Sequence, residues 1–372
     1  MSHNFNVVIV GAGIVGCSVA YELARRGLQV LVLDSREAVG QGATKASAGI
    51  LAPFVEAHDR QSLLELTRRS LGLYDEFVAN VVEDSGAAVQ YVRTGTLEVV
   101  TDHGSLARVE SIHKTCLEHG FSSALLDADG VQQMEPHLSG SALGGVFVEA
   151  HGFVAASDLT TALSRAAVIH GVKFETAAAA MRITRNGSGI SVETTTDTYF
   201  CESAVMAAGS WSGRVDVEGA MQLPIRPVRG QLLHLGWSAH ELSRVLWAPG
   251  CYVVPWKDGS VLVGATVEEV GFDERATVEG VRTLIDNTRR VIPKVADATF
   301  REARVGLRPA TPDELPIIGP SVSVPGLVYA CGHFRNGILL APLTASLVSD
   351  LVTKRISESA FAVTAPARFG EC

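Results

Sequence analysis

The sequence predicts a mixed α/β protein in which an α/β domain is interrupted by β-rich segments. Three observations predict this fold: a strand, glycine-rich turn and helix pattern at the N-terminus, a mostly antiparallel β pattern over residues 231–308, and a second strand, turn and helix pattern after residue 327. The 372 residues suffice for two cores, and 47% hydrophobic with 19% charged residues is typical of globular proteins.

The N-terminal segment begins with an apolar run at residues 7–10, and a helix pattern covers residues 14–26. The turn between them reads Gly11-Ala12-Gly13-Ile14-Val15-Gly16. In such a turn Gly11 permits the sharp bend, Gly13 lets phosphates approach the backbone, and Gly16 allows the helix to pack closely on the strand. The free N–H groups of the helix N-terminus can bind a pyrophosphate.

A second strand pattern covers residues 29–33 and ends at Asp34, which Ser35 follows. A carboxylate at this place can accept hydrogen bonds from the ribose hydroxyls of an adenosine. Strand, turn, helix and acid together predict a Rossmann-like dinucleotide site. The motif does not distinguish NAD(P) from FAD, and a glycine-rich turn that binds nothing is the structural alternative.

The rest of the chain alternates between helix and strand patterns. Helices are expected at residues 61–84, 105–119, 157–170 (with Ser157 as N-cap), 277–292 and 338–353. Strands are expected at residues 95–101, 146–149, 172–176, 201–207, 231–235, 251–255, 261–266 and 327–330. Asn186-Gly187 and Asp258-Gly259 are hairpin signals.

Two loops consist mainly of small residues. One spans residues 40–49, and the other, Ala207-Ala208-Gly209-Ser210-Trp211, follows a strand. Small side chains allow a backbone to run against a flat ligand, but an ordinary loop and a tight strand exit have the same composition. The residues alone leave both interpretations open.

Charge and cysteine content limit the possible function classes. A formal net charge of −9, without a long basic run, argues against a nucleic-acid partner. No apolar stretch is long enough for an integral membrane segment, and the N-terminal apolar run is the first strand rather than a signal peptide. Six cysteines without metal-type spacing predict buried thiols and no metal site. We therefore expect a cytoplasmic protein.

Four further motifs are spread over the chain. They are Gly49-Ile50-Leu51, Cys251-Tyr252-Val253-Val254-Pro255, the stretch 306–319 beginning Gly306-Leu307-Arg308-Pro309, and the stretch 332–342 beginning Gly332-His333-Phe334-Arg335-Asn336-Gly337. Together they resemble the D-amino-acid oxidase family of FAD-dependent amine oxidoreductases, and its glycine oxidase (ThiO-like) group in particular. The resemblance implies a discontinuous FAD-binding domain of the p-hydroxybenzoate-hydroxylase type and an antiparallel-sheet substrate domain.

The resemblance also implies a division of the chain and a mode of cofactor binding. Residues 1–85, 145–215 and 306–372 would form the FAD-binding domain, and residues 86–144 and 216–305 the substrate-binding domain. FAD is implied to be non-covalent, because Gly306 stands near the place where the sarcosine oxidase branch has its flavin-bearing cysteine. The implied cofactor-binding residues are Gly11, Ala12, Gly13, Ile14, Val15, Gly16, Asp34, Ser35, Ala43, Thr44, Lys45, Ala48, Gly49, Ile50, Leu51, Ala208, Gly209, Trp211, Gly332, His333, Phe334, Arg335, Asn336, Gly337, Ile338 and Leu339.

Three residues match catalytic and substrate-binding positions of the family. Arg308 matches its carboxylate-binding arginine, Tyr252 a tyrosine whose hydroxyl reaches the same carboxylate, and Arg335 a second active-site arginine. A planar, permanently charged guanidinium suits a carboxylate because it can donate two parallel hydrogen bonds. His333 is expected to pack or to lie at the flavin edge rather than act as a base.

The pocket departs from the glycine oxidase pattern at three positions. Ile50 and Val267, both expected to bind substrate, stand where that pattern has methionines, and Gly250 stands where it has a histidine. Loss of the histidine would open space near the substrate. The resemblance therefore implies a small substrate without identifying glycine as the best one.

The implied reaction is the oxidation of glycine, sarcosine or a small D-amino acid. Hydride passes from the α-carbon to flavin N5, the imine hydrolyses to an oxoacid and ammonia or an amine, and O₂ is reduced to H₂O₂. No side-chain base is required when the bound amine is already neutral. The family also implies a homo-oligomer and, for the glycine oxidase group, a link to thiamine biosynthesis.

Three other functions remain open. A D-amino-acid dehydrogenase of the same fold would pass electrons to a quinone or another acceptor. The absence of a basic amphipathic helix or hydrophobic anchor in the sequence argues against it. An NAD(P)-dependent oxidoreductase would explain the N-terminal motif but not the C-terminal ones, and a catalytically silent FAD-binding protein would show no turnover.

Overall fold

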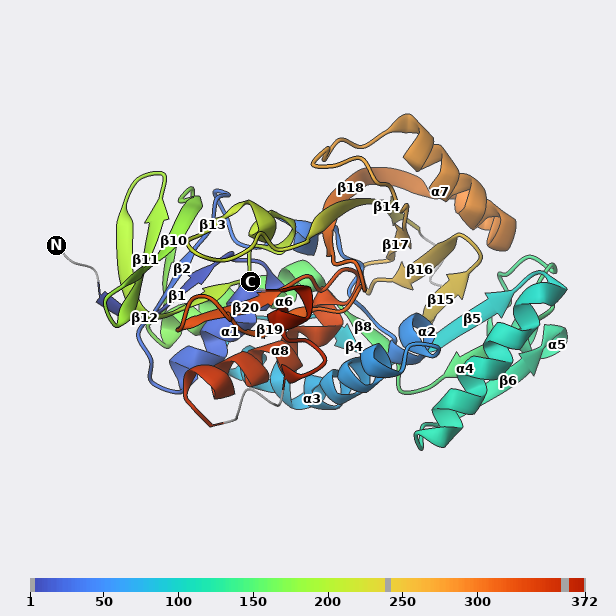
Figure 1. The fold of residues 1–372 in the computed structure, drawn as a ribbon. Coiled ribbons are helices and arrows are strands. Elements are labelled where there is room, and N and C mark those ends of the chain that lie inside the picture. The colour runs from blue at the N-terminus through green and yellow to red at the C-terminus, as the bar shows by residue number, and fades with distance from the viewer. Residues whose placement is uncertain (1–3, 238–241, 356–360, 371–372) are drawn as a thin grey trace.

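The computed structural model describes residues 4–237, 242–355 and 361–370, arranged around three β-sheets (Figure 1). The nine-stranded sheet has the order β13-β10-β11-β12-β1-β2-β9, and β20 pairs with β12 and with β19. Its strands are β1 (Asn4–Val10), β2 (Val30–Leu33), β9 (Lys173–Glu175), β10 (Ala180–Asn186), β11 (Gly189–Thr194), β12 (Thr198–Met206), β13 (Asp216–Val217), β19 (Ile317–Pro320) and β20 (Leu327–Cys331). β1 pairs in parallel with β2 and β12.

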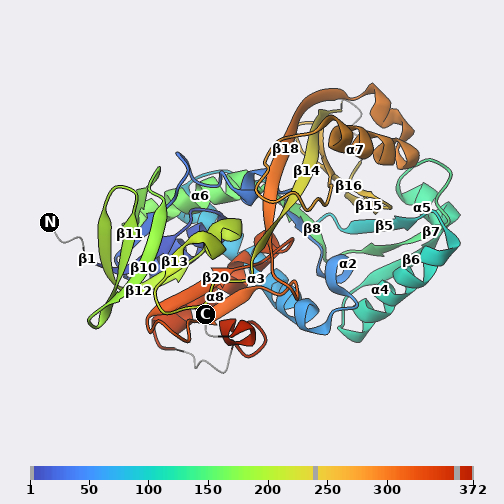
Figure 2. The same ribbon diagram turned by 45° about the horizontal axis from the view of Figure 1, so that its top comes forward.

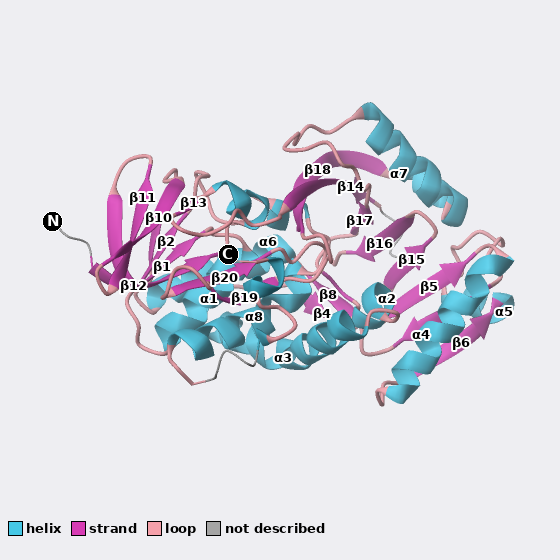
Figure 3. Cartoon of the chain, viewed as in Figure 1, coloured by secondary structure: helices cyan, strands magenta, loops and turns pink. Residues whose placement is uncertain are grey.

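Helices gather against one face of this sheet (Figure 3). They are α1 (Ile14–Arg25), α3 (Gln61–Ser85), α6 (Ala156–Ile169) and α8 (Gly337–Val352), which pack on one another. Alternate side chains of β1 point to opposite faces, so Val7 and Ile9 join the helix-side core while Val8 and Val10 join the core beneath β10–β12. A strand buried on both faces has no solvent side, which explains the unbroken apolar run.

The second part of the molecule is an eight-stranded sheet with the order β18-β14-β17-β16-β15-β5-β7-β6 (Figure 2). Its strands are β5 (Thr96–Val100), β6 (Ser123–Asp127), β7 (Gly144–Val148), β14 (Arg226–Gly236), β15 (Val245–Ala248), β16 (Cys251–Pro255), β17 (Ser260–Gly264) and β18 (Thr299–Ala310). The helices α4 (Leu106–Glu118) and α5 (Ala128–Met134) pack on β6 and β7, and α7 (Val278–Val291) packs on β14 and β16. The neighbouring strands pair antiparallel except for β5 with β15.

The smallest elements border the site described below. A three-stranded sheet contains β3 (Ile50–Leu51), β8 (Gly152–Val154) and β4 (Tyr91–Val92). The short helix α2 (Pro53–Ala57) follows β3, and two 3₁₀ turns, η1 (Ala43–Ala46) and η3 (Gly209–Arg214), lie in the small-residue loops. None of the helices in the described part of the chain has the length and apolarity to cross a membrane.

The predicted fold class is confirmed, and most predicted elements occur with small shifts at their ends. Ser157 is not the N-cap of α6, because the helix already begins at Ala156 and Ala155 occupies the cap position. β18 is not predicted as a separate strand within the broad β pattern, because its first four residues are exposed and lack an apolar alternation.

The division into two domains stays a prediction. β7 spans the predicted boundary at residue 145 and pairs in the eight-stranded sheet. β13 lies at the start of the segment 216–305, predicted for the substrate-binding domain, but pairs in the nine-stranded sheet.

The start of α8 is fixed by a hydrogen bond from outside the helix. Pro342 lies inside α8 and has no N–H, so the carbonyl of Ile338, four residues earlier, lacks its helical donor. The buried Tyr74 hydroxyl on α3 donates to this oxygen at 2.6 Å. The first turn of α8 is thereby held against α3.

Candidate active site

A cavity of about 490 Å³ is bordered by segments that are far apart in the sequence. Its wall combines the turn after β1, both small-residue loops, the end of β18 and the loop before α8. Many of the residues predicted from the sequence line it: Gly11, Gly13, Ile14, Val15, Asp34, Ser35, Ala43, Thr44, Ala48, Gly49, Ile50, Ala208, Gly209, Trp211, Tyr252, Arg308, His333, Phe334, Arg335, Gly337 and Ile338. The fold therefore brings the N-terminal and C-terminal motifs to one place.

The other predicted residues do not line the cavity: Ala12, Gly16, Lys45, Leu51, Gly332, Asn336, Leu339 and Val267. Leu51 and Leu339, for example, are buried in the layer behind the wall. Val267 differs from them, because it follows the end of β17 and the residue is 58% exposed. Its predicted contact with substrate stays a prediction.

The three glycines of the N-terminal turn have different physical roles. A Cβ on Gly11 would lie 2.4 Å from the carbonyl oxygen of Ala207, and one on Gly16 would lie 1.9 Å from the carbonyl oxygen of Gly11. Both positions therefore exclude any side chain because of packing within the protein. A Cβ on Gly13 would meet only the Thr44 hydroxyl, at 3.4 Å, so this glycine keeps the cavity open instead.

The acid after β2 is held in a fixed orientation. Asp34 Oδ2 accepts a hydrogen bond from the N–H of Ala12 at 2.6 Å, and Oδ1 accepts one from the N–H of Arg36 at 2.8 Å. Thr44 Oγ1 accepts from the N–H of Ile14 at 3.1 Å, and α1 has no acidic residue in its first turn. The helix N-terminus therefore keeps its positive electrostatic character beside the cavity.

Arg308 and Tyr252 come together because glycines make room for them. The guanidinium of Arg308 lies over Gly230, where a Cβ would be 2.4–2.5 Å from it, and a Cβ on Gly264 would be 2.3 Å from the Tyr252 hydroxyl. Arg308 Nη1 donates to the carbonyl oxygen of Thr266 at 2.9 Å. The rest of the guanidinium fork remains beside the cavity, where a carboxylate could bind it.

Burial shifts the pKa values of these two side chains in opposite directions. It lowers the pKa of Arg308, and it raises the pKa of Tyr252 above its ordinary value of 10.0. The tyrosine hydroxyl therefore stays protonated at neutral pH. It can donate a hydrogen bond to an anion that Arg308 also holds.

Arg335 is paired within the cavity wall. Its Nε lies 3.1 Å from Oε2 of Glu56, and its Nη2 donates to Oε1 of Glu56 at 3.2 Å. The neighbouring N–H of Phe334 donates to the carbonyl oxygen of Pro309 at 2.9 Å, which ties this loop to the end of β18.

His333 is buried, and its Nε2 lies 3.0 Å from the Thr344 hydroxyl. Burial lowers the pKa of His333 to about 4, so its ring is neutral at neutral pH.

Sequence reasoning missed several residues of the wall, among them Arg36, Glu56, Arg214 and Gly230. Only Gly230 among these four could have been predicted from the sequence. It is an isolated glycine inside β14, and such a glycine indicates close approach by another group. Glu56 carried no such signal, because a glutamate on a short helix after a loop has the pattern of a surface residue. The site as a whole has the features of a dinucleotide-binding oxidoreductase with an anion-binding arginine.

Comparison with known proteins assigns the family. The chain matches the FAD dependent oxidoreductase family over residues 6–351. It is 31% identical to glycine oxidase from Geobacillus kaustophilus (strain HTA426) over 363 residues, which are 97% of this chain and 96% of that protein. The crystal structure of glycine oxidase from Geobacillus kaustophilus matches with a TM-score of 0.95 and 30% identity over 99% of both chains. The chain belongs to this family of FAD-dependent oxidoreductases, which confirms the resemblance and the cofactor.

A second relative is longer than this chain. The bifunctional protein ThiO/ThiG of Synechocystis sp. (strain ATCC 27184 / PCC 6803 / Kazusa) is 34% identical over 379 residues, covering 99% of this chain. The match covers 55% of that relative, so the chain spans about half of its length.

The residues present fit FAD. The open side of Gly13 and the first-turn N–H groups of α1 would hold the pyrophosphate, and Asp34 would hold the ribose. Gly337 and Ile338 place the N-terminus of α8 at the cavity, and its first turn contains no acidic residue. A helix N-terminus stabilises negative charge, so it would suit the edge of a reduced flavin ring.

Proposed function

We propose that the chain is an FAD-dependent oxidase of glycine or a related small amino acid or amine, such as sarcosine or a small D-amino acid. The observation that carries this proposal is the presence of Arg308 and Tyr252 in the same cavity as the dinucleotide motif. The glycine oxidase relatives support the substrate class.

In this proposal the substrate carboxylate binds the guanidinium fork of Arg308 and accepts a hydrogen bond from the Tyr252 hydroxyl. Two anchors at one end of a small substrate limit its rotation, so its α-carbon is held in one orientation. FAD would supply the hydride acceptor at N5 and return the electrons to O₂ as H₂O₂. Water hydrolyses the released imine to an oxoacid and ammonia or an amine. His333 is proposed to pack rather than act as a base, because its Nε2 is engaged with Thr344.

FAD is proposed to be non-covalent. A Cβ on Gly306 would lie 2.9 Å from the Cβ of Ala46 and 3.1 Å from the Cα of Ala43, so β18 has no room for a larger side chain there. A cytoplasmic location and a homo-oligomer belong to the same proposal. The ThiO/ThiG relative supports a link to thiamine biosynthesis.

Oxygen consumption tests the proposed reaction. The purified yellow protein should take up O₂ with glycine, sarcosine, N-ethylglycine or a small D-amino acid, and catalase should return half of it because the product is H₂O₂. Substrate-dependent reduction of a quinone analogue without O₂ uptake would instead identify the D-amino-acid dehydrogenase. The absence of turnover with any acceptor would identify a silent FAD-binding protein.

Substitution of Arg308 tests the carboxylate clamp. Arg308→Ala removes a charge-assisted pair worth about 2–3 kcal/mol, so the substrate KM should rise roughly 30- to 150-fold. Arg301→Ala is the matched control, because that arginine also lies on β18 but is exposed and pairs with Asp258. An unchanged KM in Arg308→Ala with FAD retained would refute the clamp.

A further inference from the structure

The cavity wall contains an ion pair between Glu56 and Arg335, the arginine predicted as the second one of the active site. Glu56 and Arg335 make two contacts: Nε lies 3.1 Å from Oε2, and Nη2 donates a hydrogen bond to Oε1 at 3.2 Å. Both side chains line the same cavity as Arg308 and Tyr252. These contacts occupy the Nε–Nη2 edge of the guanidinium, which a ligand carboxylate would otherwise use.

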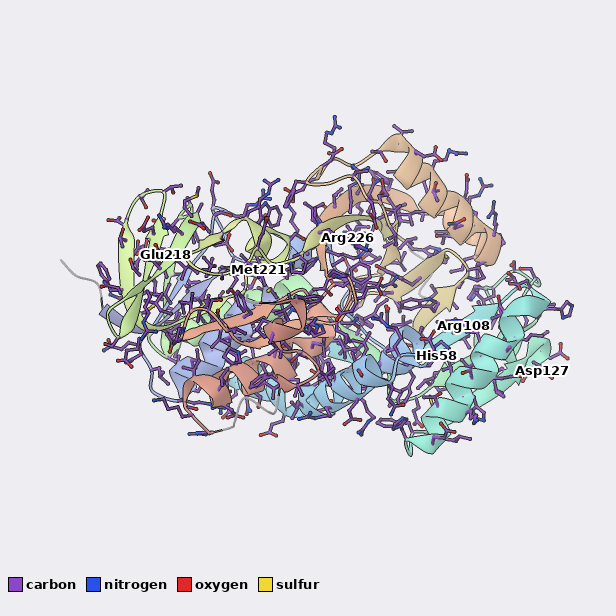
Figure 4. The ribbon with its side chains drawn as sticks, in the orientation of Figure 1. His58, Arg108, Asp127, Glu218, Met221 and Arg226 are labelled. Atoms are coloured by element: carbon purple, nitrogen blue, oxygen red, sulfur yellow. The ribbon has the colours of Figure 1, made fainter. Side chains whose placement is uncertain are left out.

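The backbone of α2 beside Glu56 is anchored by Arg108. Arg108 on α4 donates through Nη2 to the carbonyl oxygen of Val55 at 2.8 Å and through Nε to Glu98 at 2.6 Å. Figure 4 shows Arg108 and His58 at the junction of α2 and α4. The backbone next to Glu56 is thus anchored to α4, and its carboxylate is held at the wall by Arg335.

Arg335 is also restrained. Its guanidinium lies 5.8 Å from the ring centre of Trp247, whose ring in turn lies 5.3 Å from that of Tyr252. Glu56 and Arg335 keep 17% and 31% of their side-chain surface exposed, so water partly screens their attraction. Removal of the Glu56 charge would therefore leave Arg335 without this partner and able to pair with another anion.

The charges near Tyr252 define which anions the site can accept. Arg308 and Arg335 contribute two positive charges and Glu56 one negative charge, so one positive charge remains for the ligand. The other charged residues of the wall, Asp34, Arg36 and Arg214, come from the segment after β2 and from η3. A substrate with one carboxylate matches this balance, whereas a second carboxylate would meet Glu56.

We propose that Glu56 is a specificity-determining residue that restricts the site to substrates with a single carboxylate. It neutralises Arg335 and repels a second anionic group. The inference rests on the proposed function, because it assumes that Arg308 binds the substrate carboxylate. Without the charge of Glu56, two guanidinium groups would be available, and a dicarboxylic amine would fit them.

Sarcosine and iminodiacetate test this inference, because both are secondary amines and they differ by one carboxylate. Wild-type enzyme should prefer sarcosine. In Glu56→Gln the ratio of kcat/KM for iminodiacetate to that for sarcosine should rise about tenfold or more. The substitution removes the repulsive charge of Glu56 and makes Arg335 accessible as a cationic partner. The gain should disappear in the double variant Glu56→Gln/Arg335→Met. An unchanged ratio in Glu56→Gln with FAD retained would overturn the proposal.

Two further variants separate charge from structure. Glu56→Asp keeps the charge and should keep the wild-type ratio, and an effect as large as that of Glu56→Gln would assign Glu56 a structural role only. Glu65→Gln is the matched control, because Glu65 pairs with Arg68 at 2.7 Å on α3 and does not line the cavity. Equal shifts in Glu65→Gln and Glu56→Gln would also overturn the proposal.

A binding titration distinguishes failure of this inference from failure of the proposed reaction. Acetate and malonate, followed through the flavin absorbance, need no turnover. Wild-type protein should bind acetate more tightly relative to malonate than Glu56→Gln does, even if no substrate is oxidised. Equal relative affinities in the two proteins would overturn the role of Glu56, while the oxygen assay judges the oxidase separately.

Discussion

At the residue scale, the candidate site depends on glycines that leave space for larger side chains elsewhere. Gly230 lies beneath the guanidinium of Arg308, and Gly264 lies beneath the hydroxyl of Tyr252. The register of β14 against β18 places Gly230 opposite Gly306, two residues from Arg308. The glycine on β14 thus sets the position of the Arg308 side chain on the neighbouring strand β18.

Gly230→Ala should displace Arg308 without removing it. The added Cβ would lie 2.4–2.5 Å from the guanidinium, so the side chain must move. We expect the substrate KM to rise about tenfold while the flavin absorbance is retained, measured by steady-state kinetics. Gly140→Ala is the control, because its Cβ would meet nothing within 4 Å. Wild-type KM in Gly230→Ala would contradict this account of the site.

At the element scale, the strand–turn–helix unit separates packing from ligand binding. The same short sequence contains Gly16, which packing within the protein requires, and Gly13, which borders the cavity. The two roles are distinguished by what a Cβ would meet at each position. The spacing of the glycines in the sequence does not give this information.

Gly13→Ala and Gly16→Ala should therefore fail in different ways. Gly13→Ala should fold with a near-native melting temperature but bind FAD at least tenfold more weakly, because the methyl group enters the ligand space. Gly16→Ala should lower the melting temperature of the apoprotein itself. Thermal melts of apoprotein and FAD titrations would separate the two effects, and identical behaviour of the variants would contradict the assignment.

The turn between β7 and β8 carries a buried histidine that makes stability depend on pH. His151 is fully buried, stacks on Phe54 at 5.7 Å, and neither ring nitrogen has a hydrogen-bond partner among the described residues. Burial, with a smaller contribution from Arg93, lowers the pKa of His151 from 6.5 to about 3. Between these two values the unfolded chain binds a proton that the folded protein does not, so stability falls as pH falls below 6.5.

His151→Leu should make this loss of stability shallower. Each pH unit within the window is worth about 1.4 kcal/mol per histidine, so the variant should lose about 2 kcal/mol less between roughly pH 6.5 and 4.5. At pH 8 it should be at least as stable, because two unpaired polar atoms are removed. Urea unfolding across pH measures both effects, with the exposed His103→Leu as control. Parallel pH curves for wild type and His151→Leu would exclude the mechanism.

At the scale of the whole molecule, one cavity joins segments from both ends of the chain. Its wall includes Val10 from β1, Gly230 and Tyr252 from the second sheet, and Ile338 from α8. A ligand that contacts all of these segments in the folded state contacts few of them when the chain is unfolded. FAD should therefore stabilise the complete fold rather than one local element.

Removal of FAD should accordingly lower the melting temperature of the whole protein in one transition. A ligand at 100 times its Kd adds about 2.7 kcal/mol to the free energy of unfolding. Calorimetry of holoprotein and apoprotein, with FAD added back, measures the difference. A holoprotein that melts in two transitions, only one of which responds to FAD, would contradict this expectation.

Much of the fold and the cofactor end of the site could be predicted from local patterns. The apolar run of β1, the following turn and Asp34 were each recognisable from a few neighbouring residues. Arg308 and Tyr252 were found through motif resemblance, and the fold places both in the cavity. Val267 is predicted in the same way, and its contact with substrate stays a prediction, since the residue is 58% exposed and does not line the cavity.

The sequence by itself determined the fold class and the dinucleotide turn, because strand alternation and turn geometry depend on adjacent residues, and its resemblance to a family predicted Arg308 as a carboxylate-binding arginine. Only the tertiary structure decided that Glu56 meets Arg335, 279 positions away, and that Gly230 leaves space for Arg308. Such contacts depend on strand register and helix packing between distant segments. For this reason the cofactor could be inferred from short motifs and their resemblance to a family, whereas the charge balance of the candidate substrate site required the assembled fold.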